Sequence, residues 1–210
     1  MTETRGKFIT LEGIEGAGKS TMVNFIAEQL RAAGNDIVVT REPGGTRIGE
    51  QLREILLDKS NDQLCDDAEL MIIFASRAQH LKQVIEPALA AGQHVLCDRF
   101  TDASYAYQGG GRGMNPERIA QLEQWVQQGL KPDLTLLFDL DVNTGLRRAN
   151  KRGEADRFEQ EEVDFFERTR QCYLDRAAVE PDRFSIIQAD ATIEQVKEQI
   201  AAVLKASSLC

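Results

Sequence analysis

One segment of this sequence restricts the possible fold more than any other. It reads Gly13-Ile14-Glu15-Gly16-Ala17-Gly18-Lys19-Ser20 and is followed by Thr21. It matches the pattern G-x-x-x-x-G-K-[ST], in which the backbone N–H groups of a glycine-rich turn surround a phosphate group. In such a loop Lys19 reaches the terminal phosphates and the Ser20 hydroxyl binds Mg²⁺. The pattern carries this meaning only between a strand and a helix.

The sequence on both sides of this phosphate loop (residues 13–20) meets that requirement. Before it, KFITLE (residues 7–12) is rich in apolar and β-forming residues and predicts a strand. After it, apolar residues recur at helical spacing up to about Gly34, at Val23, Ile26, Ala27 and Leu30. We therefore predict a strand, a phosphate-binding loop and a helix whose N-terminal dipole adds to the anion site.

Four further strands alternate with helices along the rest of the chain. The strands are predicted at residues 36–40, 93–97, 133–138 and 184–187. The helices are predicted at residues 66–91, from Asn115 onward, at 159–178 and from Thr192 onward. The strand DIVVT (36–40) is apolar enough to be buried on both faces. The alternation predicts an α/β fold of the P-loop NTPase type in three layers, with helices on both faces of a five-stranded parallel sheet. The length fits a single domain over residues 1–210.

Composition and charge exclude several classes of protein. A net charge of −9 argues against a general nucleic-acid binder, which needs a broad basic surface. No apolar run approaches the length of a membrane span, and the first residues (MTETRGK) lack the apolar region of a signal peptide. The four cysteines are scattered without a C-x-x-C pair, as in reduced cytosolic proteins. We therefore expect a cytoplasmic protein with no nucleic-acid or membrane partner.

Charged residues follow two of the predicted strands, at the edge where ligands bind in open α/β sheets. Asp98 and Arg99 come directly after the apolar strand QHVLC (93–97). A carboxylate in this position holds Mg²⁺ or its water in phosphate-loop enzymes, and the adjacent arginine can bind a phosphate through two hydrogen bonds. Arg41 follows the strand at 36–40, where it either holds an anion or is solvated.

The predicted helix at 66–91 carries a charge on its apolar face. Phe74 belongs to the apolar stripe, and Arg77 lies three positions further on the same stripe. Arg77 either extends to water at the edge of the stripe or meets a ligand. In the second case, Phe74 and Arg77 together suit a base that stacks on the ring and offers a polar group beside it.

A polar and glycine-rich stretch follows Asp98-Arg99. Ser104, Tyr107 and Gln108 offer the mixed donors and acceptors that recognition of a base edge needs. The glycines at 109–111 allow either close packing or mobility.

The segment from Asn143 to Arg157 is basic in a chain that is acidic overall. Its positive charges are Arg147, Arg148, Lys151, Arg152 and Arg157. A solvated helix face is one interpretation. The helix break expected at Arg152-Gly153 favours another, a mobile basic flap at about 143–157 that closes over phosphates.

Together these motifs resemble the thymidylate kinase (dTMP kinase) family of the bacterial type. The resemblance covers nearly the whole chain, through TLEGIEGAGKST, TREPGGT, FASRAQH, CDRFTDASYAYQGGGRG, KPDLTLLFDL and GLRRANKRGEADRFEQ in the family's order. It implies a nucleoside monophosphate kinase that transfers the γ-phosphoryl group of ATP to dTMP, giving dTDP and ADP in dTTP biosynthesis. It also implies Mg²⁺ as cofactor and a homodimer.

The resemblance further implies a role for each candidate residue. Residues 13–20 and Thr21 bind ATP, Ser20 and Asp98 serve the metal, and Glu15 faces the 3′-hydroxyl group of dTMP. The implied acceptor residues are Phe74 stacked on thymine, Arg77 and Gln108 at the base edge with Ser104 nearby, Tyr107 beside the sugar, and Arg41 and Arg99 on the phosphate. The implied catalytic residues are Glu15, Lys19, Asp98, Arg99 and Arg152.

Arg152 is our choice for a cation that some relatives carry inside the phosphate loop, at the position of Gly16. Arg148, which we also assign to the ATP site, is the second candidate. Three other functions would share the phosphate loop: a kinase for another nucleoside monophosphate, a GTP-dependent switch, and a nucleotide-binding module without turnover. The switch would need an N-K-x-D motif, and the nearest segment, Asn150-Lys151-Arg152-Gly153, lacks the Asp. A comparison of monophosphates as acceptors would distinguish these functions.

Overall fold

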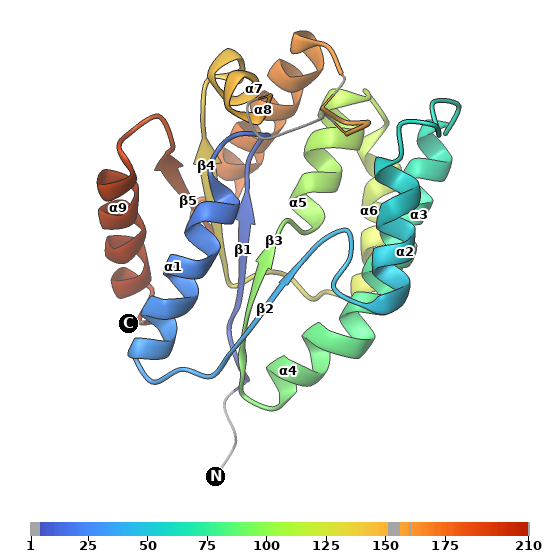
Figure 1. Cartoon of the computed structure of the whole chain (residues 1–210). Coiled ribbons are helices and arrows are strands. Elements are labelled where there is room, and N and C mark those ends of the chain that lie inside the picture. Colours follow the sequence, from blue (N-terminus) through green and yellow to red (C-terminus); the bar gives the residue numbers. More distant parts are fainter. Residues whose placement is uncertain (1–4, 151–155, 160, 210) are drawn as a thin grey trace.

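The computed structural model describes residues 5–150, 156–159 and 161–209. Its sheet contains β1 (Phe8–Glu12), β2 (Ile37–Arg41), β3 (His94–Asp98), β4 (Leu134–Asp139) and β5 (Phe184–Gln188). The strands are parallel and their order is β2-β3-β1-β4-β5, with β1 at the centre (Figure 1). The predicted five-stranded parallel sheet is confirmed. The carboxyl ends of all its strands meet at one edge, where the phosphate loop follows β1.

Helices cover both faces of the sheet (Figure 1). On one face, α1 (Lys19–Ala32) and α9 (Ile193–Ala206) pack against Ile9 and Leu11 of β1. The other face, which carries Phe8, packs against helices further along the chain. The remaining helices of the described residues are α2 (Arg47–Leu57), α3 (Asp66–His80), the π-helical turn η1 (Leu81–Ile85), α4 (Glu86–Ala90), α5 (Thr101–Ser104), the π-helical turn η2 (Tyr105–Gly111), α6 (Pro116–Gln127), α7 (Val142–Ala149) and α8 (Val163–Val179). Among the described residues, no helix combines the length and the apolar character needed to cross a membrane.

One local prediction is wrong, and one helix was not predicted. The strand at 36–40 is not buried on both faces, because β2 lies at the sheet edge and pairs only with β3; Val39 is 40% exposed. The sequence prediction also omitted α2. Its start is marked by Thr46, whose hydroxyl accepts a hydrogen bond from the Gly49 amide. The glycines around this start favour a loop in a sequence-based prediction and obscured the helix.

The glycine run after Gln108 serves close packing. It forms the end of η2 and lies against α8. A Cβ atom on Gly110 would lie 2.7 Å from the Cβ atom of Cys172, so a side chain there would force the two elements apart. This contact fixes η2 against α8 and thereby sets the positions of Tyr107 and Gln108.

Candidate active site

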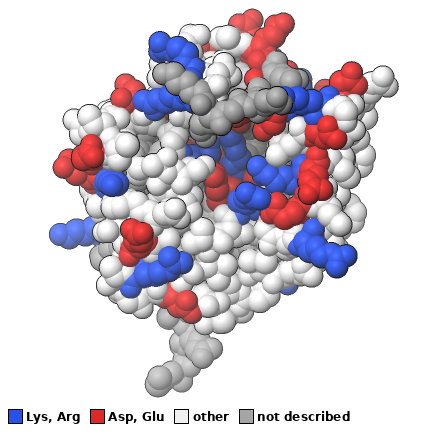
Figure 2. All heavy atoms as spheres, viewed as in Figure 1, with Lys and Arg blue, Asp and Glu red and all other residues white. Residues whose placement is uncertain are grey.

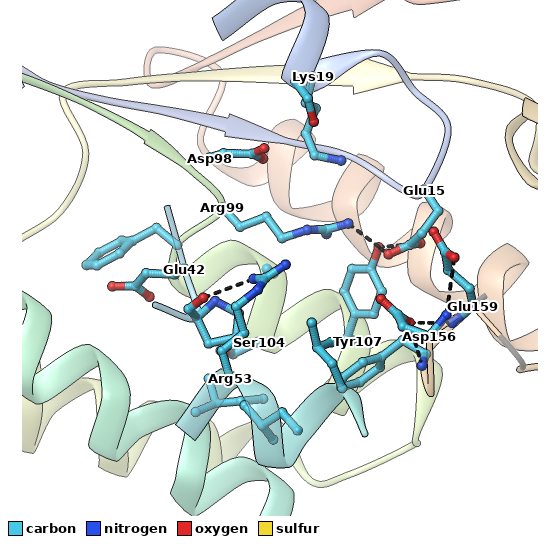
Figure 3. A pocket seen from close by; sticks show the side chains of 18 of the residues that line it. Glu15, Lys19, Glu42, Arg53, Asp98, Arg99, Ser104, Tyr107, Asp156 and Glu159 are labelled. Carbon is cyan, nitrogen blue, oxygen red and sulfur yellow. Dashed lines mark hydrogen bonds and ion pairs between the residues drawn. The ribbon is translucent and has the colours of Figure 1, made fainter. Parts of the chain in front are cut away.

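A cavity opens at the carboxyl ends of β1, β2 and β3, and we call it the central cavity (Figure 3). The phosphate loop, the turn after β2, helices α2 and α3, and the segment from Asp98 to Gln108 line it. Figure 2 shows basic and acidic side chains next to one another within the hollowed part of this face. Besides the phosphate loop, the predicted site residues that line the central cavity are Arg77, Asp98, Arg99, Ser104, Tyr107 and Gln108.

A second cavity, the outer cavity, borders the phosphate loop toward α9. Residues 16–18 and Thr21 line it together with Arg148 and Ile193. Arg148 is held there because its guanidinium Nη1 donates to the Ala189 carbonyl at 2.9 Å. Arg148 thus lies beside the phosphate loop, as predicted for a residue of the ATP site. Arg152, the preferred flap cation, lies outside the described residues.

The phosphate loop has the backbone conformation that its glycines predict. Gly16 has a φ of 72° and Gly18 a φ of 90°, and a side chain on Gly16 would collide with the carbonyl of Gly145 in α7. Lys19 is buried, and its Nζ donates to the Gly13 carbonyl at 2.8 Å and to the Ile14 carbonyl at 3.0 Å. Burial and the nearby Arg99 lower the pKa of Lys19 to about 8. The ammonium group is therefore held at the loop in a state that favours an anionic partner.

Asp98 and Ser20 have the chemistry expected of a Mg²⁺ site. Both line the central cavity and an adjoining open groove. The Asp98 Oδ1 atom is enclosed and has no hydrogen-bond partner among the described residues, so it is an oxygen available to a cation. Within that part of the chain, no cluster of three or more acidic, histidine or cysteine side chains forms a metal site by itself. Mg²⁺ in kinases is held by one or two protein oxygens, substrate phosphates and water, and these two residues fit that arrangement.

Glu15, Arg99 and Tyr107 form one hydrogen-bonded group within the central cavity (Figure 3). The Arg99 Nη2 donates to Glu15 Oε1 at 2.8 Å, and the guanidinium lies 4.6 Å from the centre of the Tyr107 ring. Burial raises the pKa of Tyr107 well above its ordinary value, so its hydroxyl keeps its proton and donates to both Glu15 oxygens, at 2.8 and 2.7 Å. A carboxylate of the phosphate loop is thus turned away from the loop's anion site and into the central cavity.

Glu12, at the end of β1, is a buried carboxyl group that the sequence prediction did not select. It accepts hydrogen bonds from the Phe100 amide at 2.7 Å and from the Tyr173 hydroxyl at 2.8 Å. The same Tyr173 hydroxyl accepts from Arg99 Nη1 at 3.3 Å. Burial and the nearby Asp102 raise the pKa of Glu12 to about 8. The sequence signal that could have identified Glu12 is an acidic residue at the end of an apolar strand.

Arg77 has hydrogen-bond partners for some of its guanidinium nitrogens but not for all of them. It is 1% exposed; its Nε donates to Glu42 Oε2 at 2.7 Å, and its Nη2 donates to Ser104 Oγ at 3.0 Å. The remaining nitrogen, Nη1, is buried and has no partner among the described residues. Because Arg77 lines the central cavity, this nitrogen is a donor available to a ligand there. The interpretation that Arg77 extends to water is wrong.

Phe74 does not line the central cavity, and its role in stacking on the base stays a prediction. Phe74 is 2% exposed and packs with Leu70 and Ile119 between α3 and α6. Its neighbour Ile73 lines the cavity instead. Arg77 lies between the two around the helix, about 40° from Ile73 and about 60° from Phe74, so Ile73 and Phe74 flank it and only the Ile73 side faces the cavity. The Arg77 guanidinium packs over the Phe74 ring, 4.5 Å from the ring centre.

Arg41 does not line the central cavity either, and its role at the acceptor phosphate stays a prediction. Its side chain is 54% exposed and pairs with Glu50 at 2.8 Å, and it lines the open groove. Arg53 of α2, which the sequence prediction missed, lines the central cavity and donates to the Pro43 carbonyl at 2.9 Å. Burial and repulsion from Arg41 lower the pKa of Arg53. A prediction of helix α2 from the sequence would have been needed to select Arg53.

Comparison with known proteins decides which kind of nucleotide site this is. A family model described as thymidylate kinase matches residues 11–200. The chain belongs to the thymidylate kinase family. The thymidylate kinase of Ectopseudomonas mendocina is 60% identical over 199 residues, 95% of each chain, and that of Alcanivorax borkumensis is 54% identical over 200 residues. The latter alignment covers 95% of this chain and 96% of the relative. The crystal structure of thymidylate kinase from Ehrlichia chaffeensis has a TM-score of 0.78 at 33% identity, covering 96% of this chain and 99% of that one.

Membership of the thymidylate kinase family makes the chain a nucleoside monophosphate kinase, a phosphotransferase with ATP as donor and dTMP as acceptor. The family, the fold and the activity predicted from the sequence are confirmed. The roles of individual residues in the thymidylate kinase reaction stay predictions.

Proposed function

We propose that the two cavities divide the substrates of thymidylate kinase between them, with ATP in the outer cavity and dTMP in the central cavity. One observation carries this proposal: Gly16, Ala17 and Gly18 line both cavities. A phosphate group held by the loop backbone would therefore lie at the boundary between them. Transfer of a γ-phosphoryl group needs this proximity of donor and acceptor.

The acceptor phosphate binds Arg99 and Arg53. Both guanidinium groups line the central cavity, and their mutual repulsion is relieved when an anion lies between them. Arg53 takes the role that the sequence prediction gave to Arg41. The 3′-hydroxyl group of dTMP donates to Glu15, which the Tyr107 and Arg99 hydrogen bonds hold in the cavity.

The thymine ring packs against Ile73, and its polar edge meets Arg77 and Gln108. Arg77 Nη1 is a buried donor without a partner, which is the group that a carbonyl oxygen of the base would satisfy. Ser104 accepts a hydrogen bond from Arg77 and supports its position. Tyr107 lies beside the sugar.

The chemistry needs alignment and charge neutralisation rather than a strong base. The nucleophile is a phosphate oxygen of dTMP, which is already anionic at neutral pH. Lys19, Arg99 and Arg152 neutralise charge on the transferring group. Mg²⁺, held by Ser20 and Asp98, supplies further charge neutralisation at the phosphates when it is bound. Enclosure of the site reduces hydrolysis of ATP by water.

The resemblance to the family also supports a cytoplasmic homodimer as our proposal for the assembly. Large apolar side chains are exposed on α2, α3 and α6, including Ile55, Met71 and Trp125. Such side chains on neighbouring helices fit burial against a second copy of the chain. Sedimentation equilibrium over a range of concentrations measures this directly, and a monomer at all concentrations contradicts it.

A coupled ADP-release assay with a panel of acceptors tests the proposed function. We expect the highest kcat/KM with dTMP, a lower value with dUMP, and little turnover with UMP, CMP, AMP or GMP. A preference for another monophosphate would reassign the base site while leaving the donor site intact. ATP binding without phosphoryl transfer to any acceptor would instead favour a nucleotide-binding module.

A further inference from the structure

Glu69, near the start of α3, is a fully buried carboxylate outside the predicted site. It accepts hydrogen bonds from three side chains: Gln108 Nε2 at 2.8 Å, Arg112 Nε and Nη2 at 3.3 and 3.1 Å, and Arg157 Nη2 at 2.5 Å. Burial alone would raise the pKa of Glu69, but the hydrogen bonds and charge of Arg112 and the bond from Gln108 hold it below its ordinary value. Glu69 is therefore ionised at neutral pH and only accepts hydrogen bonds.

An ionised Glu69 dictates which end of the Gln108 amide faces the central cavity. The amide nitrogen has to face the carboxylate, because the amide oxygen would meet a second acceptor there. The Gln108 Oε1 atom has no hydrogen bond to any described residue and is not among their enclosed, unpartnered atoms. Since Gln108 lines the central cavity, this oxygen is accessible from it as an acceptor.

The central cavity thus offers a base one donor, Arg77 Nη1, and one acceptor, Gln108 Oε1. Thymine presents the complementary pair on its edge, an O4 acceptor and an N3–H donor. Cytosine presents the reverse, an amino donor and an N3 acceptor, and would leave buried polar groups unsatisfied.

We propose that Glu69 is a positioning residue for base specificity: by fixing the Gln108 amide it makes the cavity select thymine over cytosine. The inference rests on the proposed role of Gln108 at the base edge. Arg112 and Arg157 contribute by keeping Glu69 ionised and in place.

The variant Glu69→Gln tests this inference, because a neutral amide can accept either end of the Gln108 amide. The acceptors are dTMP and 5-methyl-dCMP, which differ only at the base edge, and dUMP, which has the thymine edge without the methyl group. We expect the ratio of kcat/KM for dTMP to that for 5-methyl-dCMP to fall by about tenfold or more, the equivalent of one hydrogen bond. The dTMP-to-dUMP ratio and the KM for ATP should stay unchanged.

Asp102→Asn is the matched control. Asp102 is equally buried and is held by Arg176 and Arg183, but it does not line the central cavity. Its loss should lower stability without changing the dTMP-to-5-methyl-dCMP ratio. The same fall in both variants would show general loosening of the site and overturn the role of Glu69.

Gln108→Leu separates the inference from the function on which it rests. If this variant keeps the ratio, Gln108 does not read the base and that part of the proposed function fails. If it lowers the ratio while Glu69→Gln does not, Gln108 reads the base without help from Glu69. Should Glu69→Gln not fold, Glu69→Asp gives the same readout, because its shorter side chain keeps the charge and withdraws from Gln108.

Discussion

The phosphate loop and the central cavity are built by different means. The loop uses consecutive backbone groups and one lysine, all within residues 13–20. The central cavity uses side chains from separate elements: Arg53 of α2, Arg77 of α3, Arg99 after β3 and Gln108 of η2. Each of these has a buried or partly buried partner that holds it in place.

This difference determines which substitutions would disturb each region. The loop depends on backbone shape: a side chain on Gly13 or Gly16 would collide with neighbouring backbone, and Gly18 has a positive φ that other residues rarely adopt. The central cavity depends on side chains that hold its lining in place, such as Glu69, which accepts a hydrogen bond from Gln108 and does not itself line the cavity. Substitutions outside the cavity lining can therefore change acceptor recognition while ATP binding is retained.

The largest expected effect concerns the transferring phosphoryl group, which both regions serve. Arg152→Ala should lower kcat by about 10³-fold or more, as for other catalytic arginines, because neither region alone neutralises the transferring group. Steady-state ADP release measures kcat. Arg147→Ala is the control, since Arg147 hydrogen-bonds only within its own helix among the described residues, and it should change kcat less than about twofold. A loss below tenfold for Arg152→Ala would move the role to Arg148 or another flap residue.

Substitutions of Phe74 and Ile73 distinguish a residue that stabilises the fold beside the cavity from a residue that lines the cavity. Phe74→Ala should lower the free energy of unfolding by about 3–5 kcal/mol, since it removes a buried ring from the contact between α3 and α6. Ile73→Ala should mainly raise the KM for dTMP, by about tenfold, because it removes apolar surface facing the base. Urea unfolding and acceptor kinetics measure the two effects. A Phe74→Ala protein of ordinary stability with weak dTMP binding would restore the stacking role predicted from sequence.

Arg53 and Arg41 test which arginine holds the acceptor phosphate. Arg53→Ala should raise the KM for dTMP by about 10- to 100-fold, the range for a lost hydrogen bond to a charged group. Arg41→Ala should raise it less than about threefold, because Arg41 is exposed and paired with Glu50. The KM for ATP should be unchanged in both. Larger losses for Arg41→Ala than for Arg53→Ala would reverse the assignment.

Glu12 gives an effect of a different kind, on the pH dependence of stability. Its folded-state pKa of about 8 lies above the ordinary 4.5, so the folded protein holds this proton more tightly than the unfolded chain. The resulting stabilisation is full below about pH 4.5 and is lost as the pH rises to about 8, by at most about 1.4 kcal/mol per pH unit. Glu12→Gln removes this contribution, so its unfolding free energy in urea should decline less across that window. Identical slopes for the variant and the original protein would show that Glu12 is already ionised when buried.

Sequence by itself determined the phosphate loop, the five parallel strands and the family. These features depend on neighbouring residues: a strand, a glycine turn and a helix read from consecutive positions, and motifs in a fixed order. Residues at strand ends were also placed correctly, because parallel strands bring their carboxyl ends to one edge. Asp98 and Arg99 therefore lie beside the phosphate loop as predicted.

Only the tertiary structure decided which side chains face the acceptor. Spacing showed that Phe74 and Arg77 share one side of a helix, but the rotation of that helix is set by packing of Phe74 against α6, which turns Ile73 to the cavity. Glu69 contacts residues far away in the sequence, such as Gln108, 39 positions away, and Arg53 meets Arg99 only because both line the central cavity. A buried charge is stable only with its partners, and those partners are chosen by packing rather than by sequence spacing.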